Sequence, residues 1–254
     1  MVNAIIITQA RVGSSRLPGK LLMKINEETL LSIHLKRLKK SKLSKKIILA
    51  TTFENGVEEI IKIGKENEVE IFQGDTENVL ERFYKASCNY SPEYIVRLTS
   101  DCPLIDYRII DKLIKVVFEK KLDYVSNILE ETFPDGQDVE VFTFETLEKS
   151  YKEAKLKSDI EHVTPFMRRN SSFCGGNIFN SKNIKSLINY RTVRMTVDEI
   201  EDVKARQFLI EKFGRSLKWE VYADYINSNP SLFKNQNILR NEGYLNSLKL
   251  DSEN

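Results

Sequence analysis

Short apolar runs alternate with stretches of helical periodicity through the first half of the sequence, and this alternation is the strongest constraint on its fold. The apolar runs, each expected to form a strand, lie at 4–8, 47–51, 69–72, 94–98 and 123–126. The stretches of helical periodicity lie between them, at 28–40, 57–67, 77–89 and 107–120. Strands that alternate with helices predict an α/β fold, with a Rossmann-like, mostly parallel sheet flanked by helices.

The pattern becomes less regular after about residue 127. A turn at 133–138 ("FPDGQD") leads into 139–144 ("VEVFTF"), which we expect to form a strand of mixed direction. Further elements are predicted as helices at 145–154, 159–169 and 199–213, and as a strand returning to the sheet at 191–197. We therefore predict a main domain over 1–215, with a small β-rich insertion at about 128–192. Residues 216–254 would be a C-terminal appendage or an arm in a homodimer.

Composition excludes several classes of protein. The chain has 254 residues, of which 41% are apolar, and its net charge of +2 gives no reason to expect a nucleic-acid partner. The lysine-rich stretch at 36–46 is typical of the solvated face of a helix. No run of 18 apolar residues and no signal peptide is visible, so no membrane association is expected. The three cysteines lack metal-ligand spacing, which favours reduced thiols in a cytoplasmic protein.

The segment "QARVGSSRLPGK" at 9–20 directly follows the first predicted strand. A glycine-containing turn at this point of an α/β fold is where backbone N–H groups and a helix N-terminus bind phosphate. The segment does not match a Walker A loop, because five residues separate Gly13 from Gly19 and Leu21, not Ser or Thr, follows Lys20. It also lacks the dinucleotide-binding pattern G-x-G-x-x-G.

Three cations of this loop, Arg11, Arg16 and Lys20, have the chemistry to hold a triphosphate. The alternative is a surface loop whose basic side chains are solvated.

The segment "IITQARVGSSRLPGKLL" (6–22) resembles the signature of the sugar-activating cytidylyltransferases, which include the CMP-sialic acid and CMP-KDO synthetases. The resemblance is greatest to the spore-coat polysaccharide biosynthesis group. It extends over roughly residues 3–215 and to the tail segment at 240–247. Further matching segments, in the order of the family, are "GDTENVLERFYKA" (74–86), "IVRLTSDCPLID" (95–106), "YVSN" (124–127), "PDGQDVEVFTFETLEKS" (134–150), "EHVTPFMRR" (161–169), "RMTVDEIEDV" (194–203) and "RNEGYLNS" (240–247).

Nucleotidyl transfer requires neutralisation of phosphate charge, which Mg²⁺ held by carboxylates supplies. Asp101 follows the strand at 94–98, and Asp198 ends the strand-like segment "RMTV". The resemblance implies that both bind Mg²⁺; the alternative is that each caps a turn or a helix. Asp202 is a weaker candidate, because it lies one helical turn beyond Asp198.

The resemblance implies a nucleotide site for CTP, and the preference for cytidine rests on it alone. The expected nucleotide-binding residues are Ala10, Arg11, Gly13, Ser14, Arg16, Lys20, Thr99 and Ser100. Lys20, Arg11 and Asp101 would be the catalytic residues.

Candidates for binding the acceptor are Asp138, Glu140, His162 and Arg194. Asp138 and Glu140 are two residues apart, on one face of a predicted strand, and would orient sugar hydroxyls or face solvent. His162 is either an acceptor ligand or structural. Arg194, like Arg97 and Arg168, could meet a carboxylate or phosphate of the acceptor.

The sequence as a whole favours a CTP-dependent enzyme that activates a sugar, sugar acid or phosphorylated acceptor for surface polysaccharide or glycan biosynthesis and releases pyrophosphate. One alternative is a glycosyltransferase with a related fold, but its usual D-x-D pair is absent, since "TSDCP" offers one Asp. The other is a non-catalytic nucleotide-binding protein, which would have lost the loop lysine or a metal aspartate; Lys20, Asp101 and Asp198 are all present.

Overall fold

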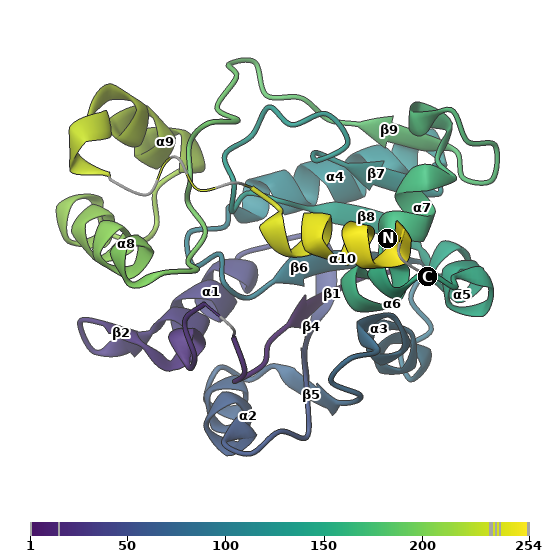
Figure 1. Cartoon of the computed structure of the whole chain (residues 1–254), viewed down its shortest axis with the longest axis horizontal. Helices are drawn as coiled ribbons and strands as arrows, with labels where there is room; N and C mark the ends of the chain where they lie inside the picture. The colour runs from purple at the N-terminus through teal and green to yellow at the C-terminus, as the bar shows by residue number, and fades with distance from the viewer. Residues whose placement is uncertain (1, 15, 234–235, 237, 239, 253–254) are drawn as a thin grey trace.

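The computed structural model describes residues 2–14, 16–233, 236, 238 and 240–252. A seven-stranded sheet runs through the molecule with helices on both of its faces (Figure 1). Its strands span Ala4–Gln9 (β1), Ser44–Thr51 (β4), Glu70–Gln73 (β5), Tyr94–Thr99 (β6), Tyr124–Ser126 (β7), Glu140–Thr143 (β8) and Ser181–Asn183 (β9). A separate antiparallel pair joins Lys24–Ile25 (β2) to Glu28–Thr29 (β3).

The sheet has the order β5-β4-β1-β6-β8-β7-β9 and is mostly parallel. Only β8 runs against its neighbours β6 and β7, which confirms the strand of mixed direction that the sequence predicts. Gln9 at the end of β1 is level with Thr99 at the end of β6. The segments that follow these two strands therefore begin at the same edge of the sheet.

The helices span Leu30–Leu38 (α1), Val57–Glu66 (α2), Val79–Cys88 (α3), Tyr107–Lys120 (α4), Phe144–Glu153 (α5), Lys157–His162 (α6), Pro165–Arg169 (α7), Ile200–Phe213 (α8), Trp219–Ser228 (α9) and Glu242–Ser252 (α10). Short 3₁₀ helices lie at Lys20–Leu22 (η1), Ser172–Cys174 (η2) and Pro230–Leu232 (η3). The five strands and four helices predicted in the first half of the chain are all present. None of the described helices is long and apolar enough to cross a bilayer.

Alternation along β1 divides the core into two layers. Ala4 and Ile6 pack with buried residues of α1, α2, α4, α8 and α9 on one face of the sheet. Ile5 and Ile7 pack with α3, α5 and α7 on the other. Because successive side chains of a strand point to opposite faces, a strand that is apolar at every position fits a sheet covered on both sides.

The segment 128–192 is not a β-rich insertion. It holds three helices, α5, α6 and α7, and its two strands, β8 and β9, both join the main sheet. The single helix expected at 159–169 is divided in two, because Val163 has a φ of 72° and Pro165 begins α7. Leu147 of α5 and Met167 of α7 are buried in the same layer of the core as Ile5 and Ile7 of β1, so these helices pack on the main sheet.

The segment 191–197 does not return to the sheet, so this prediction is wrong. It makes one isolated bridge, between Asp135 and Arg194. The N–H of Asp135 donates to the carbonyl of Val193 (2.9 Å), and the N–H of Val197 donates to the carbonyl of Asp101 (2.9 Å). The segment is thus held against two loops, and the second of these bonds sets Asp198 beside Asp101.

We predict that Gly136→Ala destabilises the protein far more than Gly175→Ala. Both glycines have positive φ (99° and 86°). A Cβ on Gly136 would lie 2.6 Å from the backbone nitrogen of Thr196, whereas nothing lies within 4 Å of one on Gly175. The free energy of unfolding in urea should fall by about 3–5 kcal/mol for Gly136→Ala and by about 1–2 kcal/mol for Gly175→Ala. Equal losses of stability in the two variants would contradict the close approach of Gly136 to the backbone of 195–196.

Candidate active site

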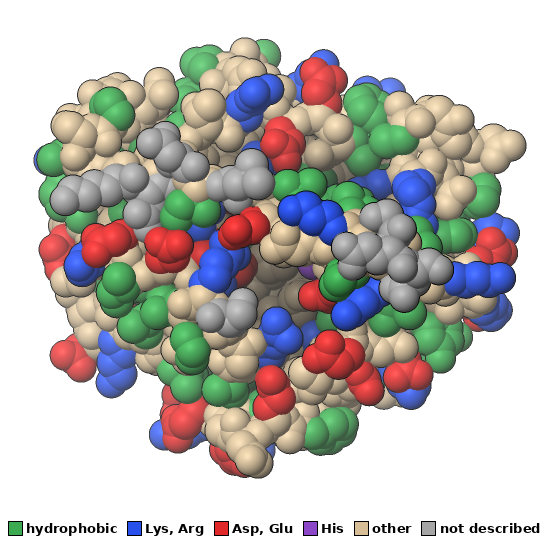
Figure 2. Space-filling model, viewed as in Figure 1, with side chains coloured by type: hydrophobic (Ala, Val, Ile, Leu, Met, Phe, Trp, Pro, Cys, Tyr) green, Lys and Arg blue, Asp and Glu red, His purple; other side chains and the backbone are tan. Residues whose placement is uncertain are grey.

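A cavity of about 470 Å³ opens at the edge of the sheet where β1 and β6 end. Figure 2 shows a hollow near the middle of this face, with Lys and Arg side chains at its rim. All of the expected nucleotide-binding residues line the cavity, as do Asp101, Asp198 and His162. The remaining lining residues are Gln9, Leu21, Thr76, Glu77, Val79, Arg82, Glu161, Glu242, Gly243 and Asn246.

The loop between β1 and η1 is shaped by close backbone contacts. The N–H of Gly19 donates to the carbonyl of Val12 (3.2 Å), and Gly19 itself has a φ of 69°, which glycine adopts without strain. A Cβ on Gly13 would lie 2.8 Å from Oε1 of Glu54. The turn at Gly19 starts η1 and directs Lys20 back toward the ends of the strands.

Lys20 joins the two aspartates that the sequence singled out. Its Nζ donates to Oδ2 of Asp101 (2.9 Å), to Oδ1 of Asp198 (2.9 Å) and to the carbonyl oxygen of Val197 (2.7 Å). Burial alone would lower the pKa of Lys20, but the two carboxylates raise it above its usual value. Burial alone would raise the pKa of Asp101, but the Lys20 ammonium holds it well below its usual range. Lys20 and Asp101 are therefore both charged at neutral pH.

Asp198 is not the cap of α8. The capping box of this helix is formed by Glu199 and Asp202. The Asp202 carboxylate accepts hydrogen bonds from the backbone N–H groups of Asp198 (2.9 Å) and Glu199 (3.1 Å). The Asp198 side chain is thereby left to face the cavity, and Asp202 holds it there.

Arg194 lies behind Asp198, not in the cavity with it. Its guanidinium donates to Asp198 (2.7 Å), Asp202 (3.1 Å) and Asp135 (2.9 Å), and only 3% of its side chain is exposed. These carboxylates raise its pKa against the effect of burial, so it stays a cation. Its expected role in contacting the acceptor does not fit this placement, because its donors are used inside the protein.

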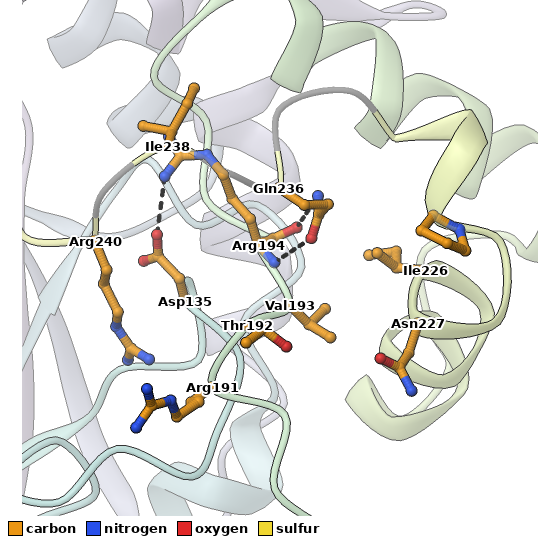
Figure 3. Close-up of a pocket in the computed structure, with 11 residues that line it drawn as sticks. Asp135, Arg191, Thr192, Val193, Arg194, Ile226, Asn227, Gln236, Ile238 and Arg240 are labelled. Atoms are coloured by element: carbon orange, nitrogen blue, oxygen red, sulfur yellow. Dashed lines mark hydrogen bonds and ion pairs between the residues drawn. The ribbon is translucent and has the colours of Figure 1, made fainter.

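A second cavity of about 400 Å³ lies on the other side of Arg194, between 191–194, α9 and the described residues of 236–240. Figure 3 shows Arg194 reaching Asp135 at the wall of this cavity, while its backbone bonds to the Gln236 side chain. Arg240, also in its wall, pairs with Asp138. Arg194 and Arg240 are thus both paired with carboxylates of the protein itself. The first cavity, which brings together the loop after β1, Asp101 and Asp198, is therefore the better candidate for the active site.

A buried chain of hydrogen bonds fixes the ends of β1 and β6 beneath the cavity. Oγ1 of Thr8 lies 2.9 Å from Oγ of Ser100 and 2.9 Å from Nε2 of His34. Nδ1 of His34 lies 2.9 Å from the carbonyl oxygen of Cys102, to which it donates. Burial lowers the pKa of His34 to about 4, so the ring is neutral. His34 is thus a helix residue with a positioning role, and the hydroxyl of Ser100, a residue that lines the cavity, is engaged by Thr8.

Glu140 is buried among donors of the protein itself. Its carboxylate accepts from Arg97 (2.9 Å), Arg168 (3.1 Å), Thr164 (3.0 Å) and the hydroxyl of Tyr124. Burial alone would raise its pKa, but Arg168 and Arg97 lower it to about 2. Only 1% of the side chain is exposed, so the structure does not place Glu140 where it could orient sugar hydroxyls.

Asp138 and His162 have different surroundings. Asp138 precedes β8 and pairs with Arg240 of the C-terminal segment, so it does not share a strand face with Glu140 and does not line the cavity. His162 does line the cavity, at the end of α6, and its Nε2 lies 3.0 Å from Oγ of Ser247 in α10. Burial lowers the pKa of His162 to about 4. Of the four acceptor candidates, the structure brings only His162 to the cavity.

The site residues expected from the sequence did not include two parts of the cavity wall. One part comes from the loop before α3, with Thr76, and from the first turn of α3, with Arg82. The other part, with Glu242 and Asn246, comes from α10. Burial lowers the pKa of Arg82 to about 10, and among the described residues neither Arg82 nor Arg11 forms an ion pair with a carboxylate. Both parts lie in segments that resemble the family, 74–86 and 240–247, and this was the only signal for them.

The family model described as cytidylyltransferase matches residues 5–228. The chain belongs to the cytidylyltransferase family. The structure of a cytidylyltransferase from Leptospira borgpetersenii serovar Hardjo-bovis is 32% identical, with a TM-score of 0.87, and covers 94% of this chain and 100% of that one. An uncharacterized protein of Methanocaldococcus jannaschii is 36% identical, over 94% of this chain and 96% of the relative.

The spore coat polysaccharide biosynthesis protein SpsF of Bacillus subtilis is 27% identical, over 84% of this cytidylyltransferase chain and 89% of the relative. These similarities confirm the predicted family and make the protein a nucleotidyltransferase enzyme. They also confirm the α/β fold with its mostly parallel sheet.

We predict that Glu140→Gln lowers the free energy of unfolding at pH 7 by about 3–5 kcal/mol, because Arg97 and Arg168 lose their buried counter-charge. The pKa of Glu140 is about 2 in the folded protein against an ordinary 4.5. Its contribution is therefore fully present above about pH 5 and is lost as the pH falls from 4.5 toward 2. Urea unfolding at several pH values measures this difference. Glu119→Gln, on the exposed side of α4, is the control. If the stability difference between Glu140→Gln and the wild type did not shrink in acid, the loss of the ion pairs with Arg97 and Arg168 would be excluded as its cause.

Proposed function

We propose that this enzyme transfers CMP from CTP to an oxygen of a sugar or sugar-like acceptor and releases pyrophosphate. The observation that carries the proposal is the contact of Lys20 with both Asp101 and Asp198, beside a phosphate-type loop and inside one cavity. The family supports cytidine as the base. The similarity to a spore coat polysaccharide biosynthesis protein supports a role in making surface polysaccharide or another glycan.

The loop after β1 is suited to hold the triphosphate. Arg11, Arg16 and Lys20 all line the cavity, and the loop contributes backbone N–H groups. Arg16 contacts Asp198 (2.8 Å) but keeps 35% of its side chain exposed, so it can reach a phosphate at the cavity rim. Arg11 has no carboxylate partner among the described residues, which leaves its donors for the nucleotide.

Asp101 and Asp198 fit a site for Mg²⁺, which prefers carboxylate oxygens and phosphate oxygens as ligands. One cation, the Lys20 ammonium, already contacts an oxygen of each carboxylate, so the two can share a bound cation. Mg²⁺ bound there would neutralise charge on the phosphates of the nucleotide. Arg194 and Asp202 hold Asp198 in place for this purpose.

In the proposed reaction an acceptor oxygen forms a bond to the α-phosphorus of CTP while the bond from that phosphorus to the β-phosphate bridging oxygen breaks. Pyrophosphate leaves, and the proton of a hydroxyl acceptor goes to solvent or to a nearby base. Lys20 and Arg16 stabilise the charge that develops on the phosphate oxygens, and the rigid ends of β1 and β6 keep the reacting groups aligned.

The proposal is tested by incubating the protein with each NTP, Mg²⁺ and a panel of acidic and phosphorylated sugars, and by measuring pyrophosphate. We expect release with CTP and at least one acceptor. A glycosyltransferase would instead consume a nucleotide sugar without pyrophosphate, and a non-catalytic protein would bind CTP without turnover. Failure of every combination, together with no CTP binding in a thermal-shift assay, would exclude the enzyme that we propose.

Asp101→Asn is predicted to lower kcat about 10²- to 10³-fold, because it removes half of the paired charge while keeping the shape of the side chain. Unfolding in urea should change little by comparison, and Glu119→Gln should retain wild-type activity. Activity retained by Asp101→Asn would remove this residue from the metal site.

Lys20 and a metal ion compete for the same two carboxylates. We therefore predict that Lys20→Met, measured without nucleotide, binds Mn²⁺ about tenfold more tightly than the wild type, since no ammonium has to leave the aspartates. Mn²⁺ binding is followed by electron paramagnetic resonance. Lys24→Met is the matched control, because the Lys24 side chain is exposed on β2. Unchanged or weaker Mn²⁺ binding to Lys20→Met would show that the metal does not use the position that Lys20 contacts.

A further inference from the structure

The C-terminal helix α10 is fixed against the cavity by contacts along its length. Figure 1 shows it crossing the front of the molecule beside α6. Ser247 donates to Oε2 of Glu161 (2.8 Å), and Asp251 accepts from the backbone N–H of Ser158 (3.1 Å). Just before the helix, Arg240 donates to the carbonyl of Phe133 (3.1 Å). The helix is therefore held to α6 and to the loop before β8.

Two helices, α6 and α10, form one wall of the cavity. Glu161 and His162 contribute from α6, and Glu242 and Asn246 contribute from α10. The hydroxyl of Ser247 bridges the two helices, since it contacts both Glu161 and His162. None of these residues belongs to the phosphate loop or to the aspartate pair. One of them, Glu242, pairs with Arg16 of the phosphate loop (3.5 Å), so this wall adjoins the proposed triphosphate site and faces the same cavity.

The polar groups of this wall are two carboxylates, an amide and an imidazole that burial keeps neutral. Two guanidinium groups approach this wall: Arg16 pairs with Glu242 (3.5 Å), and Arg168 is paired with Glu140 and lies over the Tyr244 ring. Away from Arg16, at Glu161, His162 and Asn246, the described part of the wall offers a ligand no cationic side chain. Hydroxyl groups suit it, because they donate to carboxylates and both donate to and accept from an amide.

We propose that α10 and α6 form the acceptor wall of the active site, and that Asn246 and Glu161 bind uncharged hydroxyl groups of a polyhydroxylated acceptor. This inference rests on the proposed cytidylyl transfer. It makes the C-terminal segment part of the site that selects the acceptor. Ser247 is a positioning residue, which holds Glu161 and His162 in the wall.

The variants Asn246→Ala and Glu161→Gln test the inference, with Leu245→Ala as control, because Leu245 lies on α10 but does not line the cavity. Calorimetry with Mg²⁺ measures binding of a non-hydrolysable CTP analogue. Saturation-transfer NMR, in the presence of that analogue, measures binding of four probes. KDO, N-acetylneuraminic acid and ribitol 5-phosphate carry hydroxyl chains; O-phosphoethanolamine has none.

We expect at least one hydroxyl-bearing probe to bind the wild type and Leu245→Ala, and to bind Asn246→Ala and Glu161→Gln about tenfold more weakly. Binding of the CTP analogue should be unchanged in all four proteins. The inference is overturned if the analogue binds but no hydroxyl-bearing probe does, if the two variants bind such a probe normally, or if they lose O-phosphoethanolamine or the analogue equally. If the wild type does not bind the analogue at all, it is the proposed function that fails.

Discussion

The ammonium of Lys20 between Asp101 and Asp198 is the interaction on which the rest of the site depends. It joins three segments that are far apart in the sequence: the loop after β1, the end of β6 and the segment before α8. Two carboxylates this close to a common cation would repel each other without it. This arrangement holds the three segments of the site together in the folded protein. In the proposed reaction it also supplies the cation and the carboxylates that phosphate transfer requires.

Buried arginines extend this arrangement away from the cavity. Arg194 holds Asp198, and Asp202 holds both Arg194 and the backbone of Asp198. Glu140 in turn fixes Arg97 and Arg168. A charge inside a protein has to be paired, because water no longer solvates it, and each pair therefore constrains the position of its members. Residues that looked like ligands for the acceptor in the sequence act here as supports.

The sequence was sufficient to predict six of the seven strands of the sheet, because strand and helix periodicity are local properties, but it did not reveal the short strand β9. It also singled out the loop cations and the two aspartates, which the structure brings to one cavity. It could not assign Glu140 or Arg194, because an exposed and a buried carboxylate or guanidinium look alike in a linear pattern. The segment 191–197 was mistaken for a strand for a similar reason: its alternating apolar residues are buried, but against loops and not in a sheet.

Two walls of the cavity are built from different kinds of structural element. In the proposed reaction, this difference affects how the choice of acceptor can vary. The phosphate end is made by residues at strand ends, whose positions are set by the sheet register and by buried bonds such as that of His34 to Thr8. The other wall is made by α6 and α10, which meet through exposed or half-buried side chains such as Glu161. Substitutions in this wall cost little core packing, because few of its cavity-facing side chains are buried. In the proposed reaction, acceptor preference can therefore change there while the sheet edge and its paired charges stay intact.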